Sequence, residues 1–169
     1  MKEIFILRHA KSSWSNMNLS DFDRPLAKRG INDAKKLSFF IENNCFKVDQ
    51  VICSKAKRAK ETFDFVASGF KFSIEKAIYI DDLYFGGVED VFTKIKDLDD
   101  SLESVLVVGH NPTLHLMVEN LTDTYIKKFS TCNLAVLSYK DSWNNLTSGK
   151  CKLKSLYKPK EIKIWKKSK

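Results

Sequence analysis

The sequence predicts an α/β protein, a three-layer α/β/α sandwich in which a mostly parallel sheet carries helices on both faces. Short apolar runs alternate along the chain with longer stretches whose apolar residues recur at helical spacing. The most apolar run, "SVLVVG" at 104–109, lacks the polar alternation of a half-exposed strand and therefore belongs in the middle of such a sheet. The 169 residues, 43% of them hydrophobic, suffice for one core and one domain.

The first half of the chain is expected to contain three strands and two helices. Short apolar runs predict strands at 3–7 ("EIFIL"), at 50–54 ("QVICS") and, more weakly, within 72–80. Helices are predicted within 24–44, where apolar residues recur every three or four positions, and over 56–68, which ends before Gly69. Each helix follows a strand, as repeated strand–helix units require.

The second half continues the alternation and then ends in two strands. A helix is expected over 88–98, with four apolar residues on one face: Val88, Val91, Phe92 and Ile95. The strand at 104–109 precedes a helix over 112–122, which we expect Asn111 to cap and Pro112 to open. The last two strands are expected at 134–139 and 152–157, as neighbours joined through 141–150.

The net charge of +8 is concentrated at the end of the chain. The last twelve residues contain six lysines and one glutamate, which leaves +3 for the rest. A basic tail can contact nucleic acid or anionic lipid, but such a tail is more often a solvated end. We therefore expect one domain over 1–162, a basic tail over 163–169 and no nucleic-acid partner.

The apolar runs also bear on location. None approaches the roughly 18 apolar residues that a membrane span needs. The first run stops at Arg8, which makes it too short for the apolar region of a signal peptide. The sequence therefore predicts a cytoplasmic protein without a membrane partner.

The four cysteines are expected to be reduced and structural. Cys45, Cys53, Cys132 and Cys151 show no paired short spacing of the kind that zinc sites use. Cys53 lies inside a predicted strand, and only four residues separate it from Arg58, one fewer than in phosphatases that use a Cys-x5-Arg loop. His110 and His115 are five positions apart and would face different sides of a helix. We therefore expect no metal and no other cofactor.

Cationic and imidazole side chains follow three of the predicted strands. Arg8 and His9 follow the first strand, Ser54 ends the second with Arg58 four residues later, and His110 follows 104–109 within "GHNP". Because the carboxyl ends of parallel strands meet at one edge of a sheet, these side chains should lie together. Guanidinium groups match phosphate oxygens in pairs. The sequence therefore predicts a phosphate pocket formed by Arg8, His9, Arg58 and His110.

The residue types in this pocket also suggest a reaction. A neutral imidazole can accept a phosphoryl group, and cationic neighbours favour the neutral form by lowering the histidine pKa. His9 is the predicted nucleophile, and His110 would stabilise the charge that spreads over the phosphoryl oxygens. No Walker A motif is present, which argues against ATP-driven transfer. His115 is expected to be an ordinary helical residue.

Five motifs in order resemble the histidine phosphatase superfamily, and within it the SixA-type phosphohistidine phosphatases. The motifs are "LRHAKSSW", "DFDRPLAKRG", "SKAKRAKET", "VLVVGHNP" and "LYKPKEI", and the resemblance extends from residue 4 to about residue 162. It implies a phosphoglycerate mutase-like fold. It also implies that His9 is transiently phosphorylated and that Arg8, Arg58 and His110 form the phosphate pocket.

The sequence departs from the superfamily pattern in two places. Ala10 replaces the usual glycine after the histidine, as is common in the SixA-type branch, and Ala27 lacks the oxygen with which Ser or Thr would cap the following helix. The superfamily's general acid is also not evident. The candidates are Asp81, Asp82 and Glu89, of which we favour Asp82.

An absent acid would favour phosphohistidine on a protein as the substrate, because imidazole leaves more easily than an alkoxide. A phosphatase of a small phosphorylated metabolite is the alternative, and a non-catalytic phosphate- or nucleic-acid-binding module is a third possibility. Residues 11–14 are expected to form the rim of the pocket.

Overall fold

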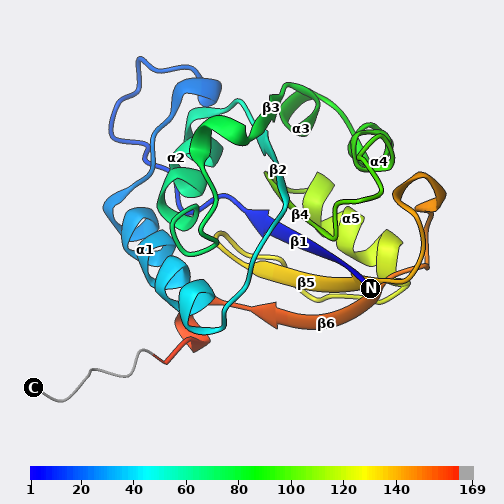
Figure 1. The fold of residues 1–169 in the computed structure, drawn as a ribbon. Helices are drawn as coiled ribbons and strands as arrows, with labels where there is room; N and C mark the ends of the chain where they lie inside the picture. Colours follow the sequence, from blue (N-terminus) through cyan, green and yellow to red (C-terminus); the bar gives the residue numbers. More distant parts are fainter. Residues whose placement is uncertain (164–169) are drawn as a thin grey trace, which may run out of the picture.

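A six-stranded sheet forms the middle of the molecule (Figure 1). The computed structural model describes residues 1–163. Its strands are β1 (Lys2–Arg8), β2 (Gln50–Ser54), β3 (Ile78–Ile80), β4 (Ser104–Gly109), β5 (Leu134–Tyr139) and β6 (Lys152–Tyr157). They lie in the order β3-β2-β4-β1-β5-β6, and β5 is antiparallel to both of its neighbours while the other pairs are parallel. The predicted mostly parallel sheet is confirmed.

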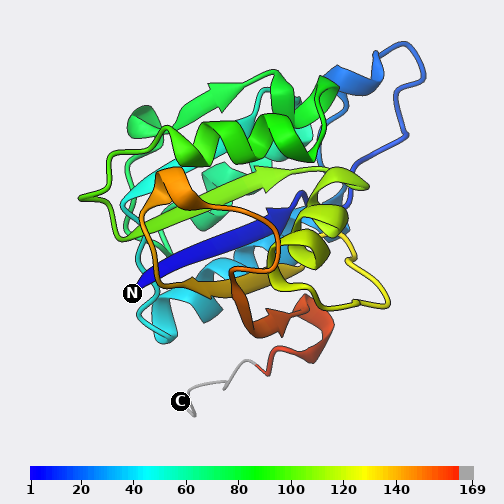
Figure 2. The ribbon, with the colours of Figure 1, turned by 90° about the vertical axis from the view of Figure 1, so that its right-hand side faces the viewer.

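Helices cover both faces of this sheet, as Figures 1 and 2 show. They are α1 (Lys28–Asn43), α2 (Lys57–Val66), α3 (Asp82–Phe85), α4 (Val88–Lys96) and α5 (Thr113–Thr122). The predicted α/β/α sandwich is thus confirmed. None of the helices within residues 1–163 is long and apolar enough to cross a membrane.

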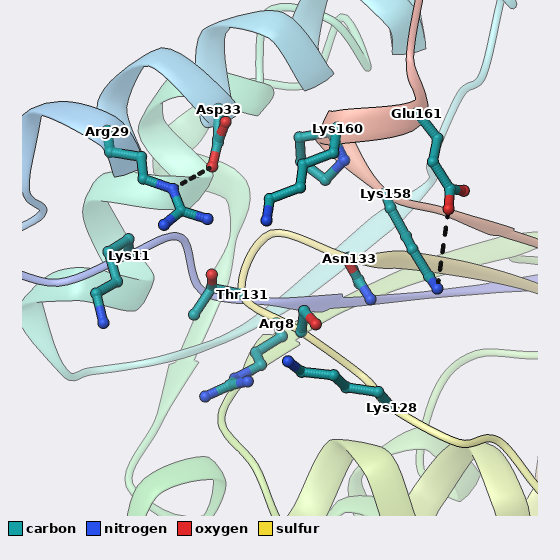
Figure 3. Close-up of a pocket in the computed structure, with 12 residues that line it drawn as sticks. Arg8, Lys11, Arg29, Asp33, Lys128, Thr131, Asn133, Lys158, Lys160 and Glu161 are labelled. Atoms are coloured by element: carbon teal, nitrogen blue, oxygen red, sulfur yellow. Dashed lines mark ion pairs between the residues drawn. The ribbon is translucent and has the colours of Figure 1, made fainter.

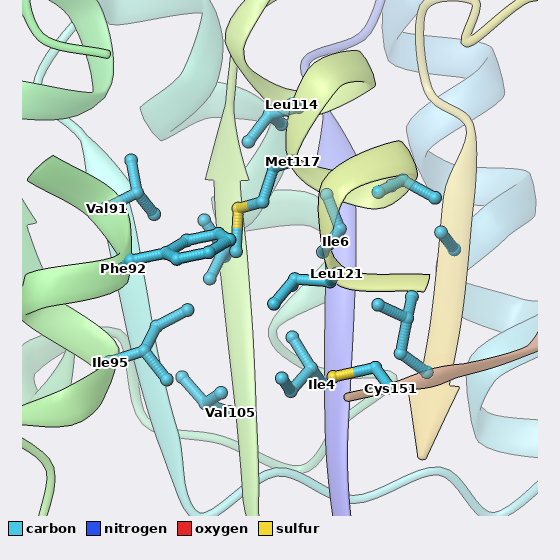
Figure 4. Close-up of a cluster of buried hydrophobic side chains, with 14 of the residues drawn as sticks. Ile4, Ile6, Val91, Phe92, Ile95, Val105, Leu114, Met117, Leu121 and Cys151 are labelled. Atoms are coloured by element: carbon cyan, nitrogen blue, oxygen red, sulfur yellow. The ribbon is translucent and has the colours of Figure 1, made fainter. Parts of the chain in front are cut away.

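The sheet divides the apolar core into two clusters because successive side chains of a strand point to opposite faces. In β1, Phe5 and Leu7 pack with α1 and α2, whereas Ile4 and Ile6 pack with α4 and α5. Figure 4 shows the second cluster, in which side chains of α4 and α5 lie over β4 and β1. Burial on both faces explains why β1 and β4 read as continuous apolar runs.

The strand predicted within 72–80 is present as β3, and a 3₁₀ turn (Ile74–Lys76) precedes it. One local prediction needs correction. Asn111 does not cap α5: Pro112 occupies the N-cap position, and Asn111 Nδ2 donates to the carbonyl of Phe129 at 2.7 Å. By contrast, α1 lacks a side-chain cap at Ala27, as the sequence predicts.

The first residues of the lysine-rich last twelve, 158–162, are folded rather than frayed. A 3₁₀ turn at Pro159–Glu161 lies next to α1, and both Pro159 and Ile162 are buried. This turn holds Lys158 and Lys160 at the carboxyl edge of the sheet, because β6 ends at that edge. Residues 164–169 of the predicted tail lie outside the described residues.

Gly30 allows α1 to approach the loop that follows β1. A Cβ at this position would collide with the backbone carbonyl of Lys11, which accepts a hydrogen bond from Ala27 N at 2.8 Å. We expect Gly30→Ala to lower the free energy of unfolding by about 2 kcal/mol, because the clash outweighs a gain of about 1 kcal/mol in helix propensity. Urea unfolding measures the difference.

The control for this prediction is Gly87→Ala, because a Cβ at Gly87 meets nothing within 4 Å. Because Gly87 is the N-cap of α4, where alanine is a poorer cap than glycine, this substitution should lower stability by only about 0.5–1 kcal/mol. A Gly30→Ala variant as stable as its parent would show that α1 does not need this close approach.

Candidate active site

The four predicted phosphate ligands meet at the carboxyl edge of the sheet. Arg8 pairs with Gly109 in the register between β1 and β4, so the next residues, His9 and His110, leave the sheet side by side. Their ring centroids are 5.0 Å apart. Arg58 lies in the first turn of α2, directly after β2. His9, Arg58 and His110 are only 7%, 7% and 8% exposed.

Backbone and hydroxyl groups hold His9 in one orientation. Its Nδ1 lies 2.7 Å from the carbonyl oxygen of Ala10, an atom that can only accept, so Nδ1 carries the proton. The remaining ring nitrogen, Nε2, therefore has a free lone pair. Ala10 N donates to Thr62 Oγ1 at 2.9 Å, and Thr62 Oγ1 donates to the carbonyl of Arg58 at 2.7 Å. These bonds join the loop that carries His9 to the helix that carries Arg58.

His110 is held through Ser54, the last residue of β2. Its Nε2 lies 2.8 Å from Ser54 Oγ, which also accepts the N–H of Ala56 at 3.2 Å. With that acceptor site used, Ser54 can donate its proton to Nε2, and Nδ1 then carries the ring proton. His110 Nδ1 is buried without a partner among the described residues. A donor of this kind suits a phosphoryl oxygen.

Burial lowers the pKa of both histidines. It is the largest cause of a pKa of about 4 for His9, with Arg58, Arg8 and Arg24 adding to the effect. The pKa of His110 falls to about 3, again mainly through burial. Both rings are therefore neutral at pH 7, the form that a nucleophilic nitrogen requires.

The lowered pKa values predict a loss of stability in mild acid. Between pH 6.5 and about 4, the unfolded chain protonates both histidines while the folded chain does not, so the unfolded state binds more protons. The stability that the two neutral rings contribute above pH 6.5 is lost progressively as the pH falls. At pH 5 the loss should be about 2 kcal/mol for each histidine relative to pH 7.

Urea unfolding at the two pH values measures this loss. His110→Asn should remove about half of the pH dependence, since it deletes one of the two titrating rings. An unchanged dependence in that variant would contradict the assignment.

Asp21 is the site residue that the sequence did not reveal. Arg58 donates to the Asp21 carbonyl at 2.6 Å and to its Oδ2 at 3.0 Å, and Tyr84 donates to the same Oδ2 at 2.6 Å. The Tyr84 bond, with Arg24 and Arg58, lowers the pKa of Asp21 to about 2. The carboxylate is therefore ionised at neutral pH and cannot serve there as a proton donor. It orients the guanidinium of Arg58 instead.

Neither aspartate considered for the general acid is paired with one of the four predicted phosphate ligands. Asp82 forms an ion pair with Lys94 at 3.7 Å and Asp81 with Lys55 at 3.2 Å, and both carboxylates are about half exposed. Glu89 is exposed at the start of α4. The acid role of Asp82 stays a prediction, and the carboxylate that contacts Arg58 is that of Asp21.

The predicted rim is partly aromatic. Trp14 is 64% exposed, with the guanidinium of Arg24 stacked 3.2 Å above its ring. Arg24 also donates to Ser12 Oγ at 2.7 Å, which ties the rim loop to the segment that contains Asp21. Phe85 is 73% exposed and stacks on Phe22 with ring centroids 6.1 Å apart. The site is thus bordered by accessible apolar surface.

Comparison with known proteins agrees with this geometry. Residues 4–101 match the histidine phosphatase superfamily (branch 1). The uncharacterized protein Rv1276c of Mycobacterium tuberculosis is 32% identical over 164 residues, which cover 91% of this chain and all of that protein.

Two solved structures share both fold and length. A protein assigned as phosphohistidine phosphatase SixA from Nakamurella multipartitia superimposes with a TM-score of 0.81 at 26% identity, over 94% of this chain and 96% of its own. A second protein assigned as phosphohistidine phosphatase SixA, from Agrobacterium tumefaciens, superimposes with a TM-score of 0.81 at 26% identity, over 94% of this chain and 98% of its own. The chain therefore belongs to the histidine phosphatase superfamily, is of the SixA type, and is a phosphatase.

Proposed function

We propose that the protein hydrolyses phosphohistidine on other proteins through a covalent phosphohistidine intermediate on His9. The observation that carries this proposal is the orientation of His9. Its Nδ1–H is bound to the Ala10 carbonyl at 2.7 Å, which leaves the Nε2 lone pair for phosphorus. Support comes also from its neighbours: Arg58 and Arg8 are close enough to lower the pKa of His9, and the ring centroid of His110 lies 5.0 Å from that of His9.

The reaction has two steps. First, the lone pair of His9 Nε2 forms a bond to phosphorus, while the bond from phosphorus to the substrate nitrogen breaks and its electron pair stays on the departing imidazole. The other ring nitrogen of the substrate carries a proton in the reacting form, so the departing group is neutral imidazole. Second, water attacks the phosphorus of phospho-His9, the N–P bond breaks, and the water proton passes to phosphate or solvent. The arginines and His110 stabilise the charge on the phosphoryl oxygens in both steps.

The chemistry of the leaving group favours phosphohistidine over a phosphate ester. An alkoxide needs a proton from a nearby acid as it departs, and the carboxylate held in the site, Asp21, has a pKa of about 2. A phosphohistidine whose second ring nitrogen is protonated releases neutral imidazole, whose conjugate acid has an ordinary pKa near 6.5, and it needs no further proton as it departs. The exposed aromatic rim of Trp14 and Phe85 offers contact surface for a folded protein.

Trapping the phosphoenzyme tests this proposal. The protein is mixed with a histidine-phosphorylated protein and quenched in alkali, and the peptide that contains His9 is analysed by mass spectrometry. We expect one acid-labile, alkali-stable phosphoryl group on His9. Turnover without any such group, or with a group on another residue, would overturn the proposed mechanism.

A substrate panel then tests the substrate class. Rates on a phosphohistidine protein are compared with rates on sugar and nucleotide phosphates. A preference of about tenfold or more for a metabolite, or about 1.4 kcal/mol in the barrier, would favour the alternative of a small-molecule phosphatase.

A further inference from the structure

A cationic cavity lies beside the phosphate site and is not explained by the reaction at His9 (Figure 3). Its volume is about 340 Å³. Two of its lining side chains are acidic, Asp33 and Glu161, and six are cationic: Arg8, Lys11, Arg29, Lys128, Lys158 and Lys160. Such an excess of positive charge in one small cavity attracts an anion.

The cavity is built against the backbone of the nucleophile. Cys132 N, in the loop that forms one wall, lies 3.1 Å from the carbonyl oxygens of both Arg8 and His9. β5 and β6 continue the sheet beyond β1, so this wall and Lys158 stand at the same edge as His9. Arg8 lines the cavity and is also close enough to His9 to lower its pKa, so it adjoins both sites.

Two buried donors at the cavity have no partner among the described residues. Asn133 is 1% exposed and lines the cavity, and its Nδ2 has no hydrogen bond. Arg8 Nε is also unpaired, although its NH1 donates to the Phe129 carbonyl at 3.1 Å. A buried donor without an acceptor costs about 1–3 kcal/mol. A bound oxyanion would supply the missing acceptors.

The acidic residues balance only part of this charge. Asp33 forms a long ion pair with Arg29 at 3.9 Å and Glu161 one with Lys158 at 4.0 Å. Six cationic and two acidic residues leave the lining with a net charge of +4. Among the described residues, no acidic side chain pairs with the other four cations: Arg8, Lys11, Lys128 and Lys160.

We propose that this cavity binds a second anionic group, a phosphate or carboxylate, carried by the same substrate molecule whose phosphoryl group His9 attacks. This inference rests on the proposed function. The second oxyanion could be an acidic side chain near the phosphohistidine of a protein, or a second phosphate on a small molecule. In both cases Arg8 adjoins the sites of both anions, and the lysines of the cavity contribute to substrate binding.

The test compares matched substrates on matched variants. One pair is a histidine-phosphorylated peptide with glutamates beside the phosphohistidine and the same peptide with glutamines. The second pair is a sugar monophosphate and the corresponding bisphosphate. The variants are Lys128→Gln, Lys158→Gln and their combination, with Lys76→Gln at the exposed turn before β3 as control. Thermal unfolding verifies that each variant is folded.

We expect the anionic member of at least one pair to be preferred about tenfold in kcat/KM, mainly through KM, at low ionic strength. The ratio of kcat/KM for the anionic member to kcat/KM for its partner should fall several-fold in Lys128→Gln and in Lys158→Gln, and should not change in Lys76→Gln. A preference within the peptide pair identifies an acidic protein segment, and one within the sugar pair identifies a small bisphosphate.

Equal rates within both pairs, or a preference that survives in the Lys128→Gln/Lys158→Gln variant, would overturn this inference. The proposed function would then still stand if phospho-His9 forms. Absence of phospho-His9 during turnover would instead overturn the proposed function, whatever the ratios are.

Discussion

His9→Asn is expected to lower turnover of a phosphohistidine substrate by at least about four orders of magnitude while the protein remains folded. Water would have to attack phosphorus directly, with no covalent intermediate. The remaining pocket, with Arg8, Arg58 and His110, would still bind phosphate. The effect should therefore fall on kcat far more than on KM.

Asparagine is the most specific replacement for His9, because it can keep the hydrogen bond to the Ala10 carbonyl while it removes the nucleophilic nitrogen. Its Nδ2 lies near the position of the histidine Nδ1 and can donate to the Ala10 carbonyl, as His9 does at 2.7 Å. The atom that is lost is Nε2. Steady-state kinetics and alkaline trapping are the measurements, and urea unfolding at pH 7 checks the fold.

The matched control is His115→Asn. His115 lies on α5, where its Nε2 lies 3.3 Å from Glu119 Oε1 and 3.0 Å from the Ile126 carbonyl oxygen. That variant should retain turnover within about twofold, because surface substitutions away from a site have small effects. If His9→Asn kept more than a tenth of the parental rate, His9 would not be the nucleophile.

Much of the fold follows from local properties of the chain. β2 and β4 have the predicted bounds, because each is a short apolar run that enters the sheet and ends at polar residues. The main helices also follow from their apolar spacing. β3 was predicted only as a strand within 72–80, because an edge strand of three partly exposed residues leaves little pattern.

The convergence of the four predicted phosphate ligands followed for a different reason. Each lies at or just after the carboxyl end of a parallel strand, so the topology alone brings Arg8, His9, Arg58 and His110 to one edge. Asp21 lies in a loop 37 positions from Arg58, and no sequence period relates the two. A clue was present in "DFDR", where an acidic residue lies three positions before Arg24, its ion-pair partner. The contact with Arg58 is set only by how that loop folds back.

The cationic cavity was also beyond sequence reasoning. The lysines at the end of the chain have the composition of a solvated tail, and the sequence alone favours that interpretation. Burial of Pro159 and Ile162 instead holds the turn that carries Lys158 and Lys160 beside α1. Long-range packing of this kind depends on the whole sheet and leaves no local signature.

Arg58→Lys is expected to lower kcat/KM by about two to three orders of magnitude, even though the charge is conserved. The guanidinium donates through NH1 and NH2 to the carbonyl and carboxylate of Asp21, at 2.6 and 3.0 Å, and is 7% exposed. An ammonium is a compact point charge that cannot reproduce this planar fork and also contact phosphoryl oxygens.

The comparison that separates charge from geometry is the series Arg58→Lys, Arg58→Met and Asp21→Asn. If charge alone mattered, lysine would restore most of the activity that methionine loses, and Asp21→Asn would change little. If the fork geometry matters, lysine and methionine should lie within about tenfold of each other, and Asp21→Asn should lower kcat/KM by about tenfold because the guanidinium loses its ionised partner.

Lys57→Gln, an exposed residue of the same helix, is the control and should retain parental kinetics. Near-parental activity in Arg58→Lys would show that the site needs only a positive charge at this position. The hydrogen bonds from Arg58 to Asp21 would then stabilise the loop that contains Asp21 rather than support the reaction. A large loss in both Arg58→Lys and Asp21→Asn, with the control unchanged, would mean instead that Asp21 positions the guanidinium for the phosphoryl group.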